Sequence, residues 1–166
     1  MIFVTVGTHE QGFERLIKEI EKLKLDKTID EEVIIQEGYT KYEPKECKVY
    51  KLIAYDDMIK YMNEARIIIT HGGPASFMMP LSINKIPIVV PRQKKYNEHV
   101  NNHQVEFVKQ VYQRYKNIIP IYDIKDLKDN IAGYNEIVKN MNIEKVSNNK
   151  YFCERLDKEL RKIFED

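Results

Sequence analysis

The stretch ARIIITHGGPASFMMP, residues 65–80, joins an apolar segment to two glycines and a proline. Three isoleucines at 67–69 are typical of a strand buried on both faces of a sheet. Pro74 suits the first position of a helix, where its missing N–H costs no hydrogen bond. The stretch therefore predicts a strand, a bare turn and a helix in immediate succession. Such a turn lets a ligand approach the N–H groups of a helix start, which carries partial positive charge.

Short runs rich in isoleucine and valine recur along the chain, and segments with apolar residues at helical spacing separate most of them. Strands that alternate with helices predict an α/β, Rossmann-like fold with a doubly wound parallel sheet. Asp56 or Asp57 is expected to cap the second helix. We expect strands at residues 2–6, 32–36, 49–53, 66–70, 86–90 and 118–121, and helices at 13–23, 56–65 and 100–115.

The composition is that of a single globular domain, here interpreted as residues 1–166. Lysine and arginine total 27 and aspartate and glutamate 26, so the basic surplus of nucleic-acid-binding proteins is missing. Cys47 and Cys153 lie far apart and outside any metal-binding motif, which argues against a disulfide framework or a zinc site. No apolar run approaches the ~20 residues of a membrane span, and no basic leader marks a signal peptide. We therefore expect a cytoplasmic location.

Residues 149–165 are expected to form a C-terminal amphipathic helix. The apolar residues either pack on the same domain or contact another chain. The stripe consists of Phe152, Leu156, Leu160, Ile163 and Phe164.

Two glycine-containing turns with little side-chain bulk follow the first and the fourth expected strands, in TVGTHEQG (5–12) and ITHGGPAS (69–76). In a sheet ordered 3-2-1-4-5-6 these turns flank the point where the winding reverses, and ligands bind there. His71 and Ser76 add donors to those of the helix start. The sequence therefore predicts a phosphate or diphosphate site. Its spacing excludes the GxxxxGK[ST], GxGxxG and GxSxG motifs.

Four segments resemble the C-terminal domain of family 28 glycosyltransferases: IFVTVGTHEQGFERLI, VIIQEG, DDMIKYMNEARIIITHGG and PIVVPRQKKYNEHVNNHQVEF. HGGPAS also resembles the His-x-Gly-x-x-Ser/Thr segment of GT-B enzymes that use nucleotide sugars. Within the family, the small catalytic subunits of two-component bacterial capsule and exopolysaccharide glycosyltransferases are the most similar. The resemblance covers about residues 1–115 and is most specific over 71–104. It implies the donor-binding, C-terminal half of a GT-B glycosyltransferase.

The resemblance also implies which residues bind a UDP-sugar. The backbone around Tyr55 would face the uracil. Gln36 matches a family glutamine, and the alternative is a solvated strand end. His103 and Gln104 would meet sugar hydroxyls, which an amide can both donate to and accept from. The residues implied around the diphosphate are Gly7, Thr8, His71, Gly72, Gly73 and Ser76.

Charged and polar residues after Pro91 allow two interpretations. Arg92 and Lys94 either add positive charge near the phosphates or belong to the surface. The cluster that follows either contacts the ligand or only caps the start of a helix. Its members are Glu98, His99, Asn101 and Asn102.

Met79 stands where related sequences often carry an acid that binds ribose hydroxyls. Glu98 is a candidate substitute for that acid. Asp56 and Asp57 could bind Mg²⁺, but helix capping explains them more simply. GT-B enzymes generally work without a bound metal, so neither a metal nor another cofactor is expected.

The resemblance further implies an inverting transferase that passes the sugar of UDP-sugar to a polyprenyl-diphosphate-linked sugar. His9 or Glu10 is a candidate base, although His9 could be structural and the base could come from a partner. A separate, membrane-anchored subunit would supply the acceptor domain and recruit this chain to the cytoplasmic membrane face. The alternative is a non-catalytic scaffold or enhancer subunit of such a complex, which Met79 favours.

Overall fold

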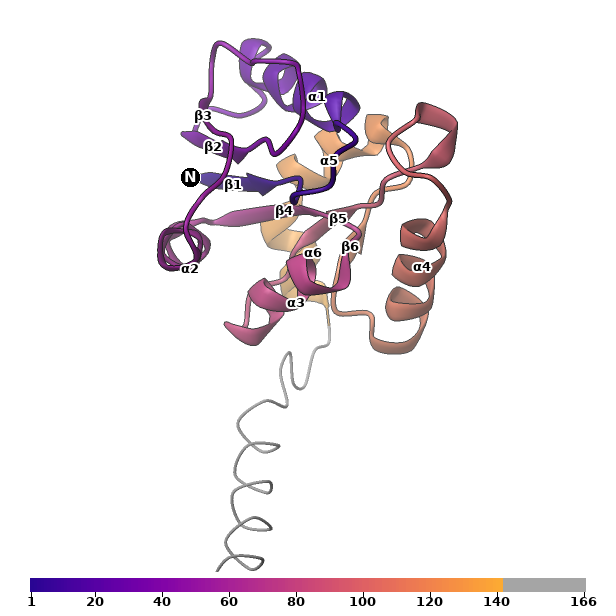
Figure 1. Cartoon of the computed structure of the whole chain (residues 1–166). Coiled ribbons are helices and arrows are strands. Elements are labelled where there is room, and N and C mark those ends of the chain that lie inside the picture. Colours follow the sequence, from indigo (N-terminus) through magenta and orange to yellow (C-terminus); the bar gives the residue numbers. More distant parts are fainter. Residues whose placement is uncertain (142–166) are drawn as a thin grey trace, which may run out of the picture.

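The computed structural model describes residues 1–141. Six parallel strands form one sheet in the order β3-β2-β1-β4-β5-β6, which confirms the predicted doubly wound topology (Figure 1). Every expected strand is present, and most are shorter than expected at one or both ends. The strands are β1 (Ile2–Thr5), β2 (Val33–Gln36), β3 (Lys48–Tyr50), β4 (Ile67–His71), β5 (Ile88–Val90) and β6 (Ile119–Pro120).

The helices expected within residues 1–141 are present and differ in detail, whereas those at 127–132 and 134–140 were not predicted. Ala54 precedes α2, and neither Asp56 nor Asp57 caps it; both lie in the first turn, where negative charge complements the helix dipole. Val100 precedes α4 and is exposed. The predicted helix at 149–165 lies outside the described residues. The helices are α1 (Glu14–Leu25), α2 (Tyr55–Glu64), α3 (Pro74–Ser82), α4 (His103–Tyr115), α5 (Leu127–Ala132) and α6 (Tyr134–Asn140), with 3₁₀ turns η1 (Lys94–Tyr96) and η2 (Ile124–Asp126).

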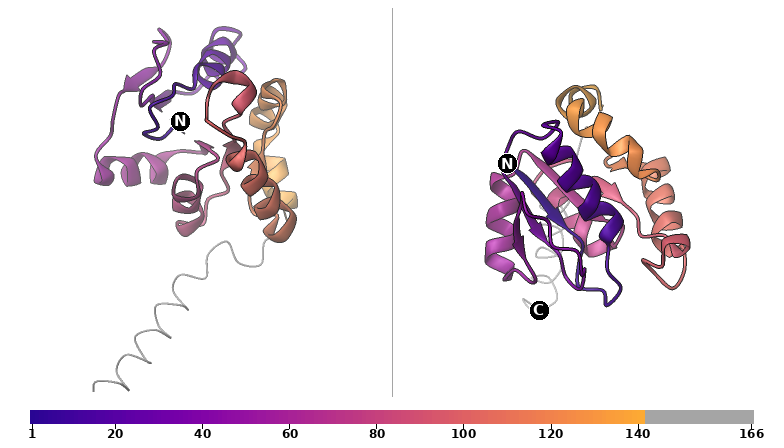
Figure 2. Two further views of the ribbon diagram at one scale, coloured as in Figure 1. Left: turned by 45° about the vertical axis from the view of Figure 1, so that its right-hand side comes forward. Right: turned by 90° about the horizontal axis from the view of Figure 1, so that it is seen from above.

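Helices cover both faces of the sheet because its inner strands are apolar on both sides. Ile2, Val4 and Ile69 belong to a large buried cluster with side chains of α1, α5 and α6. Phe3 and Ile68 point the other way and pack with α2. The right-hand view of Figure 2 shows α1 and α2 on opposite sides of the sheet. Among residues 1–141, no helix is both long enough and apolar enough to cross a lipid bilayer.

Candidate functional site

A cavity of about 650 Å³, here called the main cavity, opens at the carboxyl ends of β1, β2 and β4, between α2 and α3. Strands β1 and β4 pair directly, with Thr5 opposite Thr70, so the loops that follow them leave the sheet side by side. The main cavity therefore lies where the sequence predicted a ligand. The sequence-predicted residues that line it are Gly7, Thr8, His9, Gln36, Tyr55, His71, Gly73, Ser76 and Gln104.

The imidazole of His71 lies between two glycines from different loops. A Cβ atom added to Gly7 would overlap His71 Nε2 and lie 2.9 Å from its Cδ2. One added to Gly73 would overlap His71 Cε1 and lie 2.9 Å from its Nδ1. Gly7 also has a φ of +76°, which glycine adopts without strain. The missing side chains thus allow the β1–α1 loop to close onto the turn between β4 and α3.

Two hydrogen bonds fix the tautomer of His71. Its Nδ1 accepts the Gly73 N–H at 3.0 Å, and its Nε2 lies 2.8 Å from Ser76 Oγ. Because a nitrogen that accepts a hydrogen bond carries no proton, the neutral ring is protonated on Nε2 and donates to Ser76 Oγ. The Ser76 hydroxyl keeps its own proton for another acceptor. The chain of hydrogen bonds from Gly73 through His71 to Ser76 therefore ends in the Ser76 O–H, which is a donor at the main cavity.

The His71 ring is neutral at neutral pH. Burial and, to a smaller extent, the positive charge of Arg92 lower the pKa of His71 from 6.5 to about 4. An uncharged ring can accept the Gly73 N–H, whereas a protonated ring cannot. The low pKa therefore preserves the hydrogen bonds that orient Ser76.

We expect the free energy of unfolding to fall as the pH drops from 6.5 toward about 4, because His71 takes up a proton in the unfolded chain before it does so in the folded one. The loss should be about 2 kcal/mol, less than the full shift implies, since the ring is partly exposed. Denaturant unfolding of the wild type and of His71→Gln at about pH 7 and about pH 4.5 measures it. The stability gap between the two proteins should narrow at the lower pH. A gap independent of pH would contradict the prediction.

Gln104 joins the turn after β4 to the loop after β5. Its Oε1 accepts the Gly72 N–H at 3.0 Å and the Arg92 N–H at 3.1 Å. Neither bond uses the amide nitrogen, and the side chain lines both the main cavity and a second cavity of about 430 Å³. The carbonyl thus fixes the side chain, and the NH₂ group is a donor at the border between the two cavities.

The second cavity lies between the start of α3 and one side of α4. Among the predicted residues, Gly72, His99 and His103 line this cavity and not the main one. The side chain of His103 is 78% exposed. Glu106, Phe107 and Gln110, from α4, also line this wall. Polar side chains on an open wall suit a ligand that carries hydroxyl groups.

The main cavity has a polar part, formed by Thr5 and Gln36, and an apolar part, formed by methionines. The Thr5 hydroxyl donates to Gln36 Oε1 at 2.7 Å, and both side chains are 2% exposed. This bond leaves the Gln36 NH₂ group as a donor. Met58, Met62 and Met79 provide apolar surface. Methionine side chains adapt to the flat apolar face of a ligand.

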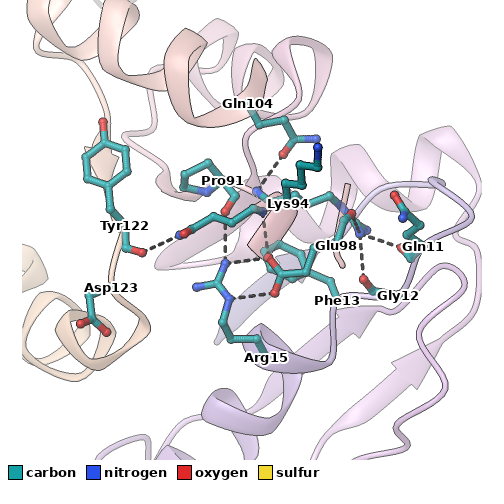
Figure 3. A network of polar contacts seen from close by, with 12 residues as sticks. Gln11, Gly12, Phe13, Arg15, Pro91, Lys94, Glu98, Gln104, Tyr122 and Asp123 are labelled. Carbon is teal, nitrogen blue, oxygen red and sulfur yellow. Dashed lines mark hydrogen bonds and ion pairs between the residues drawn. The ribbon is translucent and has the colours of Figure 1, made fainter. Parts of the chain in front are cut away.

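Arg92 and Glu98, considered as ligand contacts from sequence, line neither cavity. Their exposed fractions are 1% and 2%. Arg15 donates to both carboxylate oxygens of Glu98, at 2.8 and 2.9 Å (Figure 3). The Arg92 guanidinium donates only to backbone carbonyls. With these contacts, neither side chain reaches a ligand, and Glu98 does not replace the missing acid at position 79.

Lys94, Asn102 and Glu10 also lie outside both cavities. Asn102 Oδ1 accepts the Lys94 N–H at 3.0 Å, which supports the interpretation of this polar cluster as loop caps. Lys94 and Glu10 are exposed. The structure therefore brings the two glycine turns and Gln104 together and leaves these three residues at the periphery.

His9 lines the main cavity from the β1–α1 loop. Its Nδ1 accepts the Gln11 N–H at 3.1 Å, and its ring centre lies 4.8 Å from that of His99. Burial, the charge of Arg92 and the neighbouring His99 lower the pKa of His9. As in His71, the neutral ring is therefore protonated on Nε2. In this geometry the Nε2–H of His9 is a hydrogen-bond donor.

Sequence reasoning missed five residues that line the main cavity: Thr5, Met58, Met62, Pro74 and Ala75. Thr5 carried a signal, because a polar residue ends a strand that is otherwise apolar. The methionines carried none, since their spacing also fits core positions of a helix.

The described part of the chain, residues 1–141, contains no group of three or more His, Cys, Asp or Glu residues arranged to hold a metal ion. Asp56 and Asp57 are exposed in the first turn of α2. Their position fits a helix start without any ligand.

One comparison with a solved structure supports this fold. The glycotransferase of kitacinnamycin has a TM-score of 0.55 and 14% sequence identity, over 86% of this chain and 35% of that chain. SnogD, a glycosyltransferase from Streptomyces nogalater, has a TM-score of 0.49 and 14% identity, over 84% of this chain and 39% of that chain. The chain thus spans about a third of the length of these two proteins.

Comparison with curated proteins gave no match. The family model described as "Glycosyltransferase family 28 C-terminal domain" matches residues 1–150, most of the sequence. The six-stranded parallel sheet agrees with that match. The chain therefore belongs to the glycosyltransferase family 28 C-terminal domain family.

Proposed function

We propose that this chain binds a UDP-sugar and forms the donor-binding, catalytic part of an inverting glycosyltransferase. The observation that carries the proposal is the close contact of the two glycine turns around His71, which ends in the Ser76 hydroxyl at the main cavity. Family membership supports a nucleotide-sugar donor. The location at the point of reversed winding is the usual ligand position in such sheets.

The diphosphate would lie at the start of α3. The Gly72 and Gly73 N–H groups are already used, because they donate to Gln104 and His71. Ala75 lies in the first turn of α3, where an N–H has no acceptor within the helix. The diphosphate would therefore be held by the Ala75 N–H, the Ser76 O–H and the positive end of the helix dipole.

The rest of the donor would extend to either side of this point. The base would rest against the methionine wall near Tyr55, with the Gln36 NH₂ group as a donor to one of its carbonyls. The sugar would reach the second cavity, where the Gln104 NH₂ group and His103 would bind hydroxyls. This arrangement assigns one part of the donor to each cavity.

The reaction would be a displacement at the anomeric carbon. The acceptor hydroxyl attacks from the side opposite UDP, the bond to the diphosphate oxygen breaks, and the configuration inverts. Donors at the start of α3 and His9 Nε2–H would stabilise charge on the leaving diphosphate, and one well-aimed donor is worth roughly 3 kcal/mol elsewhere. The proton of the acceptor hydroxyl would pass to a base, for which His9 and Glu10 on this chain and a group of another chain are the candidates.

The acceptor in this proposal is a polyprenyl-diphosphate-linked sugar bound to a second, membrane-anchored chain. That chain would recruit this one to the cytoplasmic membrane face for capsule or exopolysaccharide synthesis. The support is the resemblance of residues 71–104 to the small subunits of such enzymes. Co-purification with a membrane-anchored partner, and transfer to the lipid-linked acceptor only when both chains are present, tests this part.

Calorimetric titration with UDP is the primary test. We expect one site with a dissociation constant below about 1 mM, or about 4 kcal/mol of binding free energy. UMP should bind more weakly, because it has no second phosphate for the α3 start. No heat at millimolar UDP would contradict the proposal and would favour the scaffold alternative, for which Met79 at the cavity wall is the supporting observation.

A further inference from the structure

Residues 7–10 form an arch whose two ends are both bound by Arg92. The guanidinium Nη2 donates to the Val6 carbonyl at 2.8 Å, immediately before the arch. Its Nη1 donates to the carbonyls of Gln11 at 2.7 Å and Gly12 at 3.0 Å, immediately after it. One side chain from the loop after β5 therefore determines where the loop after β1 begins and ends.

The environment of Arg92 is specific to a planar cation. Nη1 also donates to the Glu98 carbonyl at 3.1 Å, and the guanidinium carbon lies 4.8 Å from the centre of the Phe13 ring. Figure 3 shows Gln11, Gly12 and Phe13 near Glu98 and Arg15. Burial lowers the pKa of Arg92 to about 10, so it is still charged at neutral pH. A buried charge is retained because several carbonyls replace its water.

We propose that Arg92 is a positioning residue, which holds the arch of residues 7–10 against His71 and so preorganises the diphosphate site. This inference rests on the proposed function for the assignment of the cavity as a diphosphate site. The position of the arch can be measured without a ligand. The arch contributes Gly7, Thr8 and His9 to the main cavity, although Arg92 itself does not line it. The sequence left Arg92 either near the phosphates or on the surface, whereas the structure buries it against the backbone of this loop.

Lysine should not replace arginine here. The guanidinium has five N–H donors in a rigid plane and reaches Val6 on one nitrogen while it reaches Gln11 and Gly12 on another. An ammonium group has three donors at a single point. Lysine would keep the charge and lose one end of the arch, while methionine would lose both.

The charge of Arg92 also acts on His71. The groups that face His71 are Ser76 from α3, His9 from the arch, Arg92 and His99 from the loop after β5, and Gln104 from α4. Removal of the Arg92 charge should therefore raise the pKa of His71 from about 4 toward 6.5, although burial still lowers it. Lysine at this position should leave the pKa of His71 closer to its wild-type value.

The test uses Arg92→Met and Arg92→Lys, with Ile131→Ala as a control that removes buried side-chain volume in α5 at a residue that lines neither cavity. The first readout is NMR without ligand: the His71 titration and the amide shifts of residues 7–10. We expect moved arch amides in both arginine variants, a raised His71 pKa in Arg92→Met, and neither change in the control.

The second readout is UDP affinity. We expect a loss of about 100-fold for Arg92→Met and about tenfold for Arg92→Lys, and less than about twofold for Ile131→Ala. If wild-type UDP binding is absent, the proposed function fails, and the NMR readout still decides the role of Arg92. Wild-type arch amides and His71 titration in folded Arg92→Lys and Arg92→Met would overturn the inference. If Arg92→Met does not fold, the arch amides of Arg92→Lys decide it.

Discussion

Replacement of His71 by alanine is expected to lower UDP affinity by about 100-fold, or about 3 kcal/mol. The variant loses two functions of the ring. The Gly73 N–H no longer has its acceptor. Ser76 Oγ no longer accepts the hydrogen bond from His71 Nε2–H, which leaves the Ser76 O–H free to donate into the main cavity. The ring also fills the space between Gly7 and Gly73, so its removal loosens the contact between the two loops. Calorimetric titration with UDP at neutral pH measures the loss.

A double-mutant cycle tests whether His71 acts through Ser76. Ser76→Ala alone should cost about tenfold in UDP affinity, because one hydroxyl donor is lost. The double variant should bind UDP at most about threefold more weakly than His71→Ala, since both changes interrupt one series of hydrogen bonds. Ser82→Ala is the matched control on the same helix; its exposed hydroxyl donates to the Met79 carbonyl and should leave affinity unchanged. Wild-type affinity in His71→Ala would exclude the assigned role.

The sheet could be predicted from sequence because its inner strands carry the pattern that burial on both faces requires. Ile67, Ile68 and Ile69 are each at most 1% exposed, and no amphipathic alternation competes with the strand assignment. The order of the strands was taken from the common doubly wound arrangement, 3-2-1-4-5-6, and the structure has that order. Strand ends were less predictable, since Leu52 is apolar and exposed beyond β3.

The sequence predicted where the candidate site lies, but not which groups the two glycine turns contact. The sequence interpretation gave the glycines to the ligand, as places where a phosphate could approach the backbone. In the fold, Gly7 and Gly73 make room for the His71 ring. Nothing local to residue 7 indicates this contact, because 64 positions separate it from His71. A requirement for glycine that arises from tertiary packing cannot be distinguished in one sequence from one that arises from a ligand.

Arg92 and Glu98 illustrate the same limit for charged residues. A basic and an acidic side chain in a polar loop are usually exposed. Here three of the four carbonyls that accept from Arg92 come from residues 6, 11 and 12, about 80 positions away, and Glu98 pairs with Arg15 at a similar separation. Composition favours the surface for such residues, and tertiary contacts override it.

Gly73→Ala should reduce UDP affinity about as strongly as His71→Ala, by about 30-fold to 100-fold, through sterics alone. The backbone of Gly73, with φ −73° and ψ 132°, is allowed for alanine, so no backbone strain is introduced. The added methyl would overlap His71 Cε1, and the ring must move away from Ser76.

The same substitution in a His71→Ala background separates steric displacement of the ring from direct contact with the ligand. Without the imidazole, the methyl at position 73 has no ring to displace, so the second change should cost less than about twofold in UDP affinity. If the methyl acts instead by blocking the diphosphate, the two losses should multiply, because the block does not depend on the ring. Calorimetry on the four proteins of this cycle therefore decides whether the His71 ring or the ligand requires the absence of a side chain at position 73. The packing of His71 against both glycines favours the histidine.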